Sequence, residues 1–233
     1  MNNIAFNIEE IRDRVSSSLK ASHRSADAVS ILAVSKTRSV AEIQAAIALG
    51  IEDFGENYLQ EACAKIKAIS SSSPSSGSPR WHYIGPIQAN KTRTISELFH
   101  WVHTVDRLKI AQRLNAQRPE PLPPLNICIQ VNIDNEASKS GISLAEVPAL
   151  AAEIHQLPRL KLRGLMIIPQ KDAGEAQRKT TFRTLAKTLD TLKASIPELD
   201  TLSMGMSADY PLAIQEGATC IRLGTAIFGP RTA

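Results

Sequence analysis

The chain has 233 residues, of which 43% are hydrophobic and 21% charged, a composition typical of a globular protein with one substantial core. The formal net charge of +4 is spread along the chain and aromatic residues make up only 4%, so no basic stripe or interleaved aromatics indicate nucleic-acid binding. No apolar run approaches the roughly 18 residues that a membrane-spanning helix needs.

The cysteines and the first residues favour a protein of the reducing cytoplasm. Cys63, Cys128 and Cys220 are far apart and form no CxxC pair, which argues against a disulfide framework or a zinc site. The opening "MNNIAFNIEEIRDRV" is polar and acidic as well as apolar, unlike a signal peptide. We therefore expect a cytoplasmic protein without a metal site.

The predicted elements begin with a helix and continue with strands. Apolar residues recur every three or four positions from Ile4 to Leu19, which predicts an amphipathic helix. Eight short apolar runs then alternate with helical segments, at 31–35, 52–55, 81–85, 101–105, 126–133, 162–168, 201–206 and 220–224. Strict alternation of strand and helix predicts parallel strands with crossover helices.

Residues that typically start and end helices support this alternation. In "SVAEIQAAIALG", Ser39 and Glu42 form a capping box and Gly50 ends the helix. Ser143 and Glu146 repeat the capping box in "SLAEVPALAAEIHQLP". Each of these capping boxes therefore predicts the start of a helix.

The fold class that follows is α/β, as a single (β/α)8 TIM barrel with an additional N-terminal helix. We expect residues 1–233 to form this one domain, and an open doubly wound sheet is the structural alternative. The Ser-rich segment "SSSSPSSGSP", residues 70–79, is predicted to be a flexible surface loop within the barrel domain.

Lys36 is the first candidate functional residue, because function in a barrel gathers at the carboxyl ends of the strands. It directly follows the apolar run "ILAVS". Partial desolvation there would lower the pKa of the amine and make it a nucleophile toward a carbonyl. The alternative is a lysine that merely extends to solvent from a strand end.

The loops after strands seven and eight form a candidate phosphate site, as in many barrels. Gly205, Ser207, Gly224 and Thr225 offer hydroxyl groups and approachable backbone N–H groups. A helix over residues 208–216 is expected to start at Ser207, and ordinary helix capping is the alternative role for this serine.

Arg222 lies inside predicted strand eight. Pointing into the barrel it must find an acceptor, whereas pointing outward it would pair with a carboxylate, and the sequence leaves both orientations open. A lysine amine, a phosphate pocket and an arginine between them would fit a ligand that carries both an aldehyde and a phosphate. Pyridoxal 5′-phosphate (PLP) is that ligand.

The chain resembles the pyridoxal phosphate homeostasis proteins, the YggS/PROSC family, over essentially its whole length. The order and spacing of seven motifs make the resemblance specific. The motifs are "LAVSKT", "FGENYLQE", "WHYIGPIQANK", "VHTVDR", "NICIQVNID" with "SKSGI", "LRGLMIIP" and "LSMGMSADYPLAIQEGATCIRLGTAIFG". One departure is Ala208, where relatives often have an acidic residue.

The resemblance implies a barrel related to that of the bacterial alanine racemases, with PLP held as an internal aldimine on Lys36. It also implies the roles of the other site residues. The phosphate would be held by Ser207, Gly224 and Thr225, Arg222 would face the pyridine nitrogen, and Asn57 would lie beside the ring.

We expect a PLP carrier or buffer without strong catalysis. An arginine at the pyridine nitrogen favours the unprotonated ring, which is a weaker electron sink. In the racemases a tyrosine from a second domain of the partner subunit acts on the opposite face, and we expect no such domain here. Tyr58 and Tyr210, expected in loops on the open face, could still support weak activity.

Several alternatives remain open at this point. They are a weakly active PLP-dependent amino acid racemase, a Schiff-base aldolase without bound cofactor, and a regulatory module that acts through a protein partner. For a carrier, the expected partners are PLP and PLP-dependent apoenzymes as recipients, and the protein is expected to be a monomer.

Overall fold

Eight parallel strands close into a barrel in the computed structural model of this protein, which describes residues 3–72, 79–133, 140–170 and 172–230. Each strand pairs with the next along the chain, and β1 pairs with β8. The strands are β1 Ser30–Val34, β2 Asp53–Glu56, β3 Arg80–Tyr83, β4 Trp101–Val105, β5 Leu125–Val131, β6 Leu160–Ile167, β7 Thr201–Met206 and β8 Cys220–Leu223. Closure of the sheet rules out the open doubly wound alternative.

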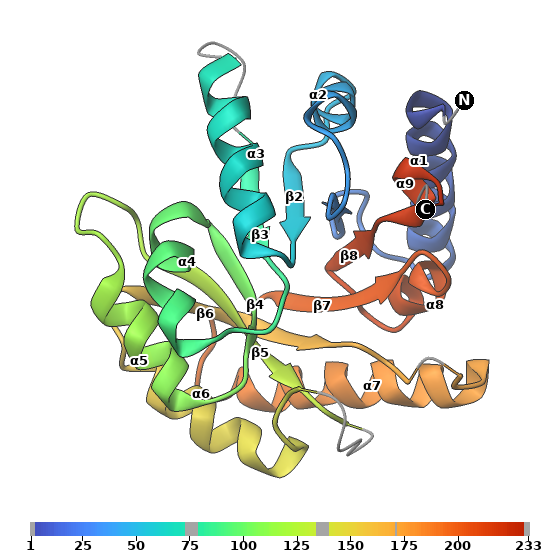
Figure 1. Ribbon diagram of the computed structural model, residues 1–233. Coiled ribbons are helices and arrows are strands. Elements are labelled where there is room, and N and C mark those ends of the chain that lie inside the picture. Colours follow the sequence, from blue (N-terminus) through green and yellow to red (C-terminus); the bar gives the residue numbers. More distant parts are fainter. Residues whose placement is uncertain (1–2, 73–78, 134–139, 171, 231–233) are drawn as a thin grey trace.

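Helices surround the barrel (Figure 1). One α-helix follows each strand, and α1 precedes β1, so the predicted eight units with an additional N-terminal helix are confirmed. The helices are α1 Ile4–Ala21, α2 Val40–Ala48, α3 Leu59–Ser72, α4 Thr92–Leu98, α5 Leu108–Gln117, α6 Val147–His155, α7 Glu175–Leu192, α8 Tyr210–Gln215 and α9 Thr225–Phe228, with short 3-10 helices η1 Ala89–Lys91 and η2 Leu144–Glu146.

The strands start within two residues of their predicted positions, and two helix boundaries differ from the prediction. The capping boxes at Ser39 and Ser143 are both present. Helix α3 continues through Ser72, so the first part of the Ser-rich segment is helical and residues 73–78 lie outside the described residues. The helix expected from Ser207 begins instead at Tyr210, with Asp209 at its N-cap position.

The first helix packs against the last two helices of the chain. Its buried face, which includes Ile8, Ile11 and Leu19, belongs to the main hydrophobic core. The Asn7 side-chain Nδ2 donates a hydrogen bond to the carbonyl oxygen of Ile227 in α9 at 2.8 Å. Helices α1, α8 and α9 therefore lie side by side, close to both chain ends (Figure 1).

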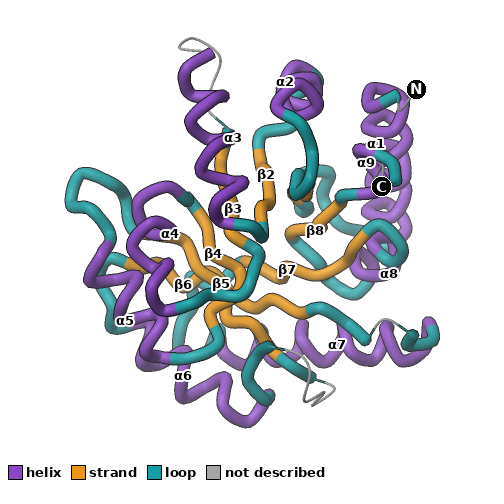
Figure 2. The backbone as a smooth tube through the Cα atoms, in the orientation of Figure 1, coloured by secondary structure: helices purple, strands orange, loops and turns teal. Residues whose placement is uncertain are grey.

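The loops that follow the strands lead into the outer helices (Figure 2). Because all eight strands are parallel, their carboxyl ends share one face of the barrel. Within the described ranges, no helix combines the length and the apolar character needed to cross a bilayer. The carboxyl face is where the predicted site residues are found.

Candidate functional site

A cavity of about 490 Å³ opens at the carboxyl ends of the strands. Barrel closure brings to it residues that are far apart in the sequence. All six residues predicted to form the site line this cavity: Lys36, Asn57, Ser207, Arg222, Gly224 and Thr225. Apolar walls come from residues such as Val34, Ile84 and Met166, so the cavity has the mixed lining of a small-molecule site.

Lys36 lies in a tight turn directly after β1 and is half-buried. The next residue, Thr37, has a φ of 64°, a left-handed conformation that is rare for a β-branched residue. Its backbone N–H donates a hydrogen bond to Glu61 Oε1 at 2.5 Å. This contact stabilises the turn, so Lys36 is held at the cavity wall and does not extend freely from a strand end.

A largely buried group of polar and charged residues contacts the Lys36 turn. Lys65 Nζ donates hydrogen bonds to the Ser35 carbonyl oxygen at 2.7 Å, to Glu56 Oε1 at 2.8 Å and to Glu61 Oε1 at 2.5 Å. The Ser35 hydroxyl donates to Glu56 Oε1 at 2.6 Å. We call Ser35, Glu56, Glu61 and Lys65 the Lys65 cluster.

The Lys65 cluster was not predicted from the sequence. Glu56 is fully buried and Glu56 Oε2 has no hydrogen-bond partner. Burial raises the pKa of the Glu56 carboxyl, although hydrogen bonds from Lys65 and Ser35 oppose the shift. The available signal was an acidic residue at the end of a short buried strand, followed by Glu61 and Lys65 one helical turn apart.

Asn57 follows β2 and presents a buried acceptor. Its side-chain Oδ1 has no hydrogen-bond partner, a state that costs free energy unless a ligand or water donates to it. The backbone here packs closely against the β3 loop, because a Cβ atom on Gly85 would lie 2.4 Å from the Asn57 carbonyl oxygen. Only glycine at position 85 lets Asn57 occupy this place at the cavity.

The loops after β7 and β8 meet as predicted, but Ser207 does not cap α8. The backbone N–H of Ala226 donates instead to Ser207 Oγ at 3.1 Å, so this serine joins the β7 loop to the first turn of α9. The N-cap position of α8 is Asp209, whose Oδ1 accepts a hydrogen bond from the Met206 N–H at 2.7 Å. Ser207, Gly224 and Thr225 thereby share one end of the cavity.

Arg222 points into the barrel, which settles the orientation that the sequence left open. Its side chain donates hydrogen bonds to Ser203 Oγ at 2.8 Å and to the Ile167 carbonyl oxygen at 2.7 Å. The residue is only 5% exposed. These two acceptors hold the guanidinium in the cavity wall.

A second arginine in the cavity wall was missed. Arg38, two residues after Lys36, lines the cavity and pairs with Glu42 at 3.4 Å. It also donates to the Gly229 carbonyl oxygen at 2.5 Å. Its position after the strand-one lysine was the available signal, since a cation at a strand end of a barrel is a candidate anion contact.

The expectation that Tyr210 lies on the open face was wrong. Tyr210 starts α8 with its side chain 2% exposed, and the Arg14 guanidinium from α1 lies 5.9 Å from its ring centre. Helix α8 lies against α1, and this contact buries the Tyr210 side chain. Tyr58 is 52% exposed.

Comparison with known proteins identifies the family. Residues 2–232 match the family described as "Alanine racemase, N-terminal domain". A Pseudomonas aeruginosa protein named "Pyridoxal phosphate homeostasis protein" is 52% identical over 231 residues, which cover 99% of this chain and 97% of that protein. The chain belongs to the pyridoxal phosphate homeostasis protein family. The resemblance carried by the sequence motifs is thus confirmed.

Solved structures of a similar protein share the whole barrel. PipY of Synechococcus elongatus PCC7942, in a structure without PLP, is 35% identical, with a TM-score of 0.86 over 97% of this chain and 100% of that one. A second structure of PipY has PLP bound and gives a TM-score of 0.80 over 94% of this chain and 100% of that one. PipY therefore shares the fold described above over its whole solved chain.

Proposed function

We propose that this chain is a PLP carrier of the homeostasis family, which binds PLP in the carboxyl-face cavity through Lys36 and releases it to PLP-dependent apoenzymes. One observation carries the proposal: the six residues predicted for the cofactor line a single cavity. The PLP-bound structure of PipY, a relative of 35% identity, supports the same ligand class.

The cavity residues suit PLP in size and in chemistry. The volume of about 490 Å³ lies within the roughly 300 to 1,000 Å³ of small-molecule sites. Lys36 supplies an amine for the aldehyde, and Ser207 and Thr225 supply hydroxyl groups for the phosphate. The unpartnered buried Oδ1 of Asn57 would accept a hydrogen bond from the ring's polar substituents.

Each residue then has one task in binding. Lys36 would be the covalent anchor, while Ser207, Gly224 and Thr225 would hold the phosphate. Arg222 would lie against the pyridine nitrogen, and the apolar wall would exclude water from the ring. PLP supplies an electron sink when bound, and it does so strongly only when its ring nitrogen is protonated.

The arginine favours binding over catalysis. A guanidinium donates hydrogen bonds and accepts none, so Arg222 would meet the ring nitrogen as an acceptor and keep it unprotonated. The weakly active racemase remains the second candidate, because the exposed Tyr58 belongs to the loop after β2. Exchange of the α-proton of alanine or serine in heavy water at enzymatic rates would establish it in place of the carrier.

A titration with PLP followed by absorbance tests the proposal. The parent protein should develop a saturable band that Lys36→Ala lacks. Lys91→Ala is the matched control, because Lys91, at the end of η1, is also half-buried yet does not line the cavity. A band that survives Lys36→Ala, or none in the parent, would contradict the proposed anchor.

We further propose that the carrier works as a cytoplasmic monomer. Cys63, Cys128 and Cys220 are all free thiols, which suits a reducing compartment. Loaded protein should restore activity to a PLP-dependent apoenzyme without forming a stable complex. Capture of one particular protein both with and without PLP would instead favour a regulatory module.

A further inference from the structure

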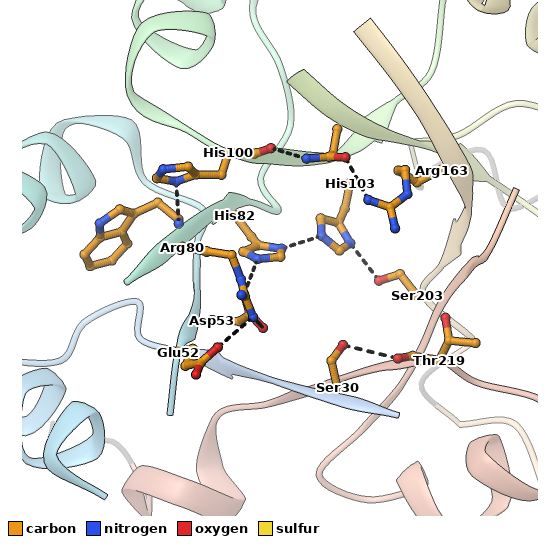
Figure 3. Close-up of polar contacts among 12 residues, drawn as sticks. Ser30, Glu52, Asp53, Arg80, His82, His100, His103, Arg163, Ser203 and Thr219 are labelled. Atoms are coloured by element: carbon orange, nitrogen blue, oxygen red, sulfur yellow. Dashed lines mark hydrogen bonds and ion pairs between the residues drawn. The ribbon is translucent and has the colours of Figure 1, made fainter. Parts of the chain in front are cut away.

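A hydrogen-bonded chain of buried side chains crosses the barrel interior from Arg222 to Asp53. Arg222 donates to Ser203 Oγ at 2.8 Å, and Ser203 Oγ lies 2.8 Å from His103 Nδ1. His103 Nε2 lies 2.9 Å from His82 Nδ1, and His82 Nε2 lies 3.0 Å from Asp53 Oδ1. Figure 3 shows His82 between Asp53 and His103, with Ser203 beyond His103.

The chain joins two cavities at opposite ends of the barrel. Arg222 lines the carboxyl-face cavity. Asp53, His82 and His103 line a second cavity of about 550 Å³, formed where the strands begin. All five members of the chain are at most 7% exposed, so water does not replace their mutual hydrogen bonds.

The two ends of the chain fix the direction of every hydrogen bond. An ionised carboxylate only accepts hydrogen bonds, so a neutral His82 must carry its proton on Nε2 and leave Nδ1 as an acceptor. His103 must then donate from Nε2 and accept at Nδ1 from the Ser203 hydroxyl. Ser203 Oγ in turn accepts from the guanidinium of Arg222, which can only donate.

The protonation states that this pattern requires agree with the surroundings. Burial lowers the pKa of both His82 and His103, which keeps both rings neutral. Burial alone would raise the pKa of the Asp53 carboxyl, but hydrogen bonds from Arg80 and His82 hold it well below its usual range. The chain is thus polarised from a fixed cation to a fixed anion, and such chains strengthen cooperatively.

Arg222 depends on this chain for its position. Among the described residues, no carboxylate forms an ion pair with Arg222, and its two acceptors are Ser203 Oγ and the Ile167 carbonyl oxygen. By accepting the Ser203 proton at Nδ1, His103 fixes the rotation of the hydroxyl, so that a lone pair of Ser203 Oγ faces Arg222. A change at Asp53, across the barrel, would therefore alter the hydrogen bond to the arginine.

We propose that Ser203, His103, His82 and Asp53 are positioning residues that orient Arg222 toward the ring nitrogen of bound PLP. The inference rests on the proposed function. It adds four residues that are not among the six predicted site residues. On this proposal, residues at the end of the barrel where the strands begin help to set the protonation state of the ring nitrogen of PLP.

The tautomers provide a first test that needs no cofactor. Two-dimensional ¹⁵N–¹H correlation of the histidine rings at neutral pH should show His82 and His103 neutral, with both protons on Nε2. A charged ring, or a proton on Nδ1 of either residue, would overturn the directed chain. This result stands whether or not the protein binds PLP.

The second test uses ring-¹⁵N-labelled PLP bound to the protein. Ser203→Ala should move the ring-nitrogen chemical shift and weaken PLP binding about tenfold, the scale of one hydrogen bond to a charged group. Asp53→Asn should move the same shift, and its effect should vanish when combined with Ser203→Ala, since the chain is then already broken. Ser30→Ala removes a hydroxyl from the second cavity but not from the chain, and should change neither reading.

Each outcome of the second test has a distinct meaning. Attachment of PLP at Lys36 in the parent, with unchanged shifts in both variants, would overturn the positioning role alone. Additive effects in the double variant would show separate structural damage and no relay. Absence of PLP attachment in the parent would contradict the proposed function. The tautomer measurement would still test the directions of the hydrogen bonds from Asp53 to Arg222. If Asp53→Asn fails to fold, His82→Gln serves as the far-end variant.

Discussion

At the residue scale, the turn that carries Lys36 depends on charges that are buried and mutually paired. Lys65 is 6% exposed and lies between two carboxylates, Glu56 and Glu61. Glu61 also accepts the backbone N–H of Thr37, the residue with a left-handed backbone. Lys65 does not line the cavity. Its hydrogen bonds nevertheless stabilise the turn that carries Lys36, the proposed PLP anchor.

Replacing Lys65 should destabilise the fold strongly. Lys65→Met leaves two carboxylates without their cation, and breaking a buried ion pair costs about 3 to 5 kcal/mol. Because burial already raises the pKa of Glu56, its carboxyl should take up a proton in the variant, and the loss of stability should shrink as the pH falls. Urea unfolding at pH 8 and pH 5.5 measures both effects.

The neighbouring Lys67 provides the control for this experiment. It lies on the same helix with an exposed side chain, so Lys67→Met should change the free energy of unfolding by less than about 0.5 kcal/mol. Equal losses in the two variants would show that Lys65 acts as an ordinary surface charge.

Asp53 should contribute to the stability of the protein in a pH-dependent way. Its carboxyl has a lowered pKa in the folded protein, so its contribution is present above the usual carboxyl pKa of about 4 and is lost as the pH falls below it. Asp53→Asn should therefore flatten the decline in unfolding free energy as the pH falls below about 4. An unchanged slope in the variant would contradict the ion pairing with Arg80.

At the scale of elements, local signals determined where the helices begin. The Ser39 hydroxyl oxygen accepts the Glu42 N–H at 3.2 Å, and Glu42 Oε2 accepts the Ser39 N–H at 2.8 Å. Helix α2 thereby starts at Val40, four residues after Lys36. The capping box thus connects the strand-one loop to a rigid element.

Removing this cap should cost about 1 kcal/mol. Ser39→Ala leaves the Glu42 N–H without its side-chain acceptor, so the urea midpoint should fall. Ser17→Ala, on the exposed face of α1, is the matched change without a cap and should leave the midpoint nearly unchanged. Equal midpoints for Ser39→Ala and the parent would show that the cap contributes nothing measurable.

Strand order, barrel closure and the six cavity residues followed from periodicity, from strand ends and from the family motifs. Features that depend on contacts between distant elements did not. Tyr210 was misplaced because it is buried against α1, a helix from the other end of the chain. Ser203 and His103 are a hundred residues apart in the sequence. They become hydrogen-bond partners only once the barrel closes.

At the scale of the whole molecule, α1 lies against α8 and α9, the helices that flank the β7 and β8 loops. The hydrogen bond from Asn7 to Ile227 ties it to α9, whose first turn contains Thr225 of the proposed phosphate site. The N-terminal helix therefore supports the end of the cavity where we place the phosphate.

A core change in α1 should weaken the barrel. Ile11 is 4% exposed, so Ile11→Ala should lower the free energy of unfolding by about 2 to 5 kcal/mol. Phe6, on the same helix, is 59% exposed, and Phe6→Ala should have little effect in the same denaturation experiment. A larger loss from Phe6→Ala than from Ile11→Ala would contradict the packing of this helix.

The most direct test of the account is borohydride reduction of the PLP-treated protein followed by peptide mass mapping. We predict one added pyridoxyl phosphate group, located on Lys36 and absent from Lys36→Ala. A reduced adduct on a different lysine, or no adduct at saturating PLP, would contradict the assignment of the carboxyl-face cavity as the cofactor site.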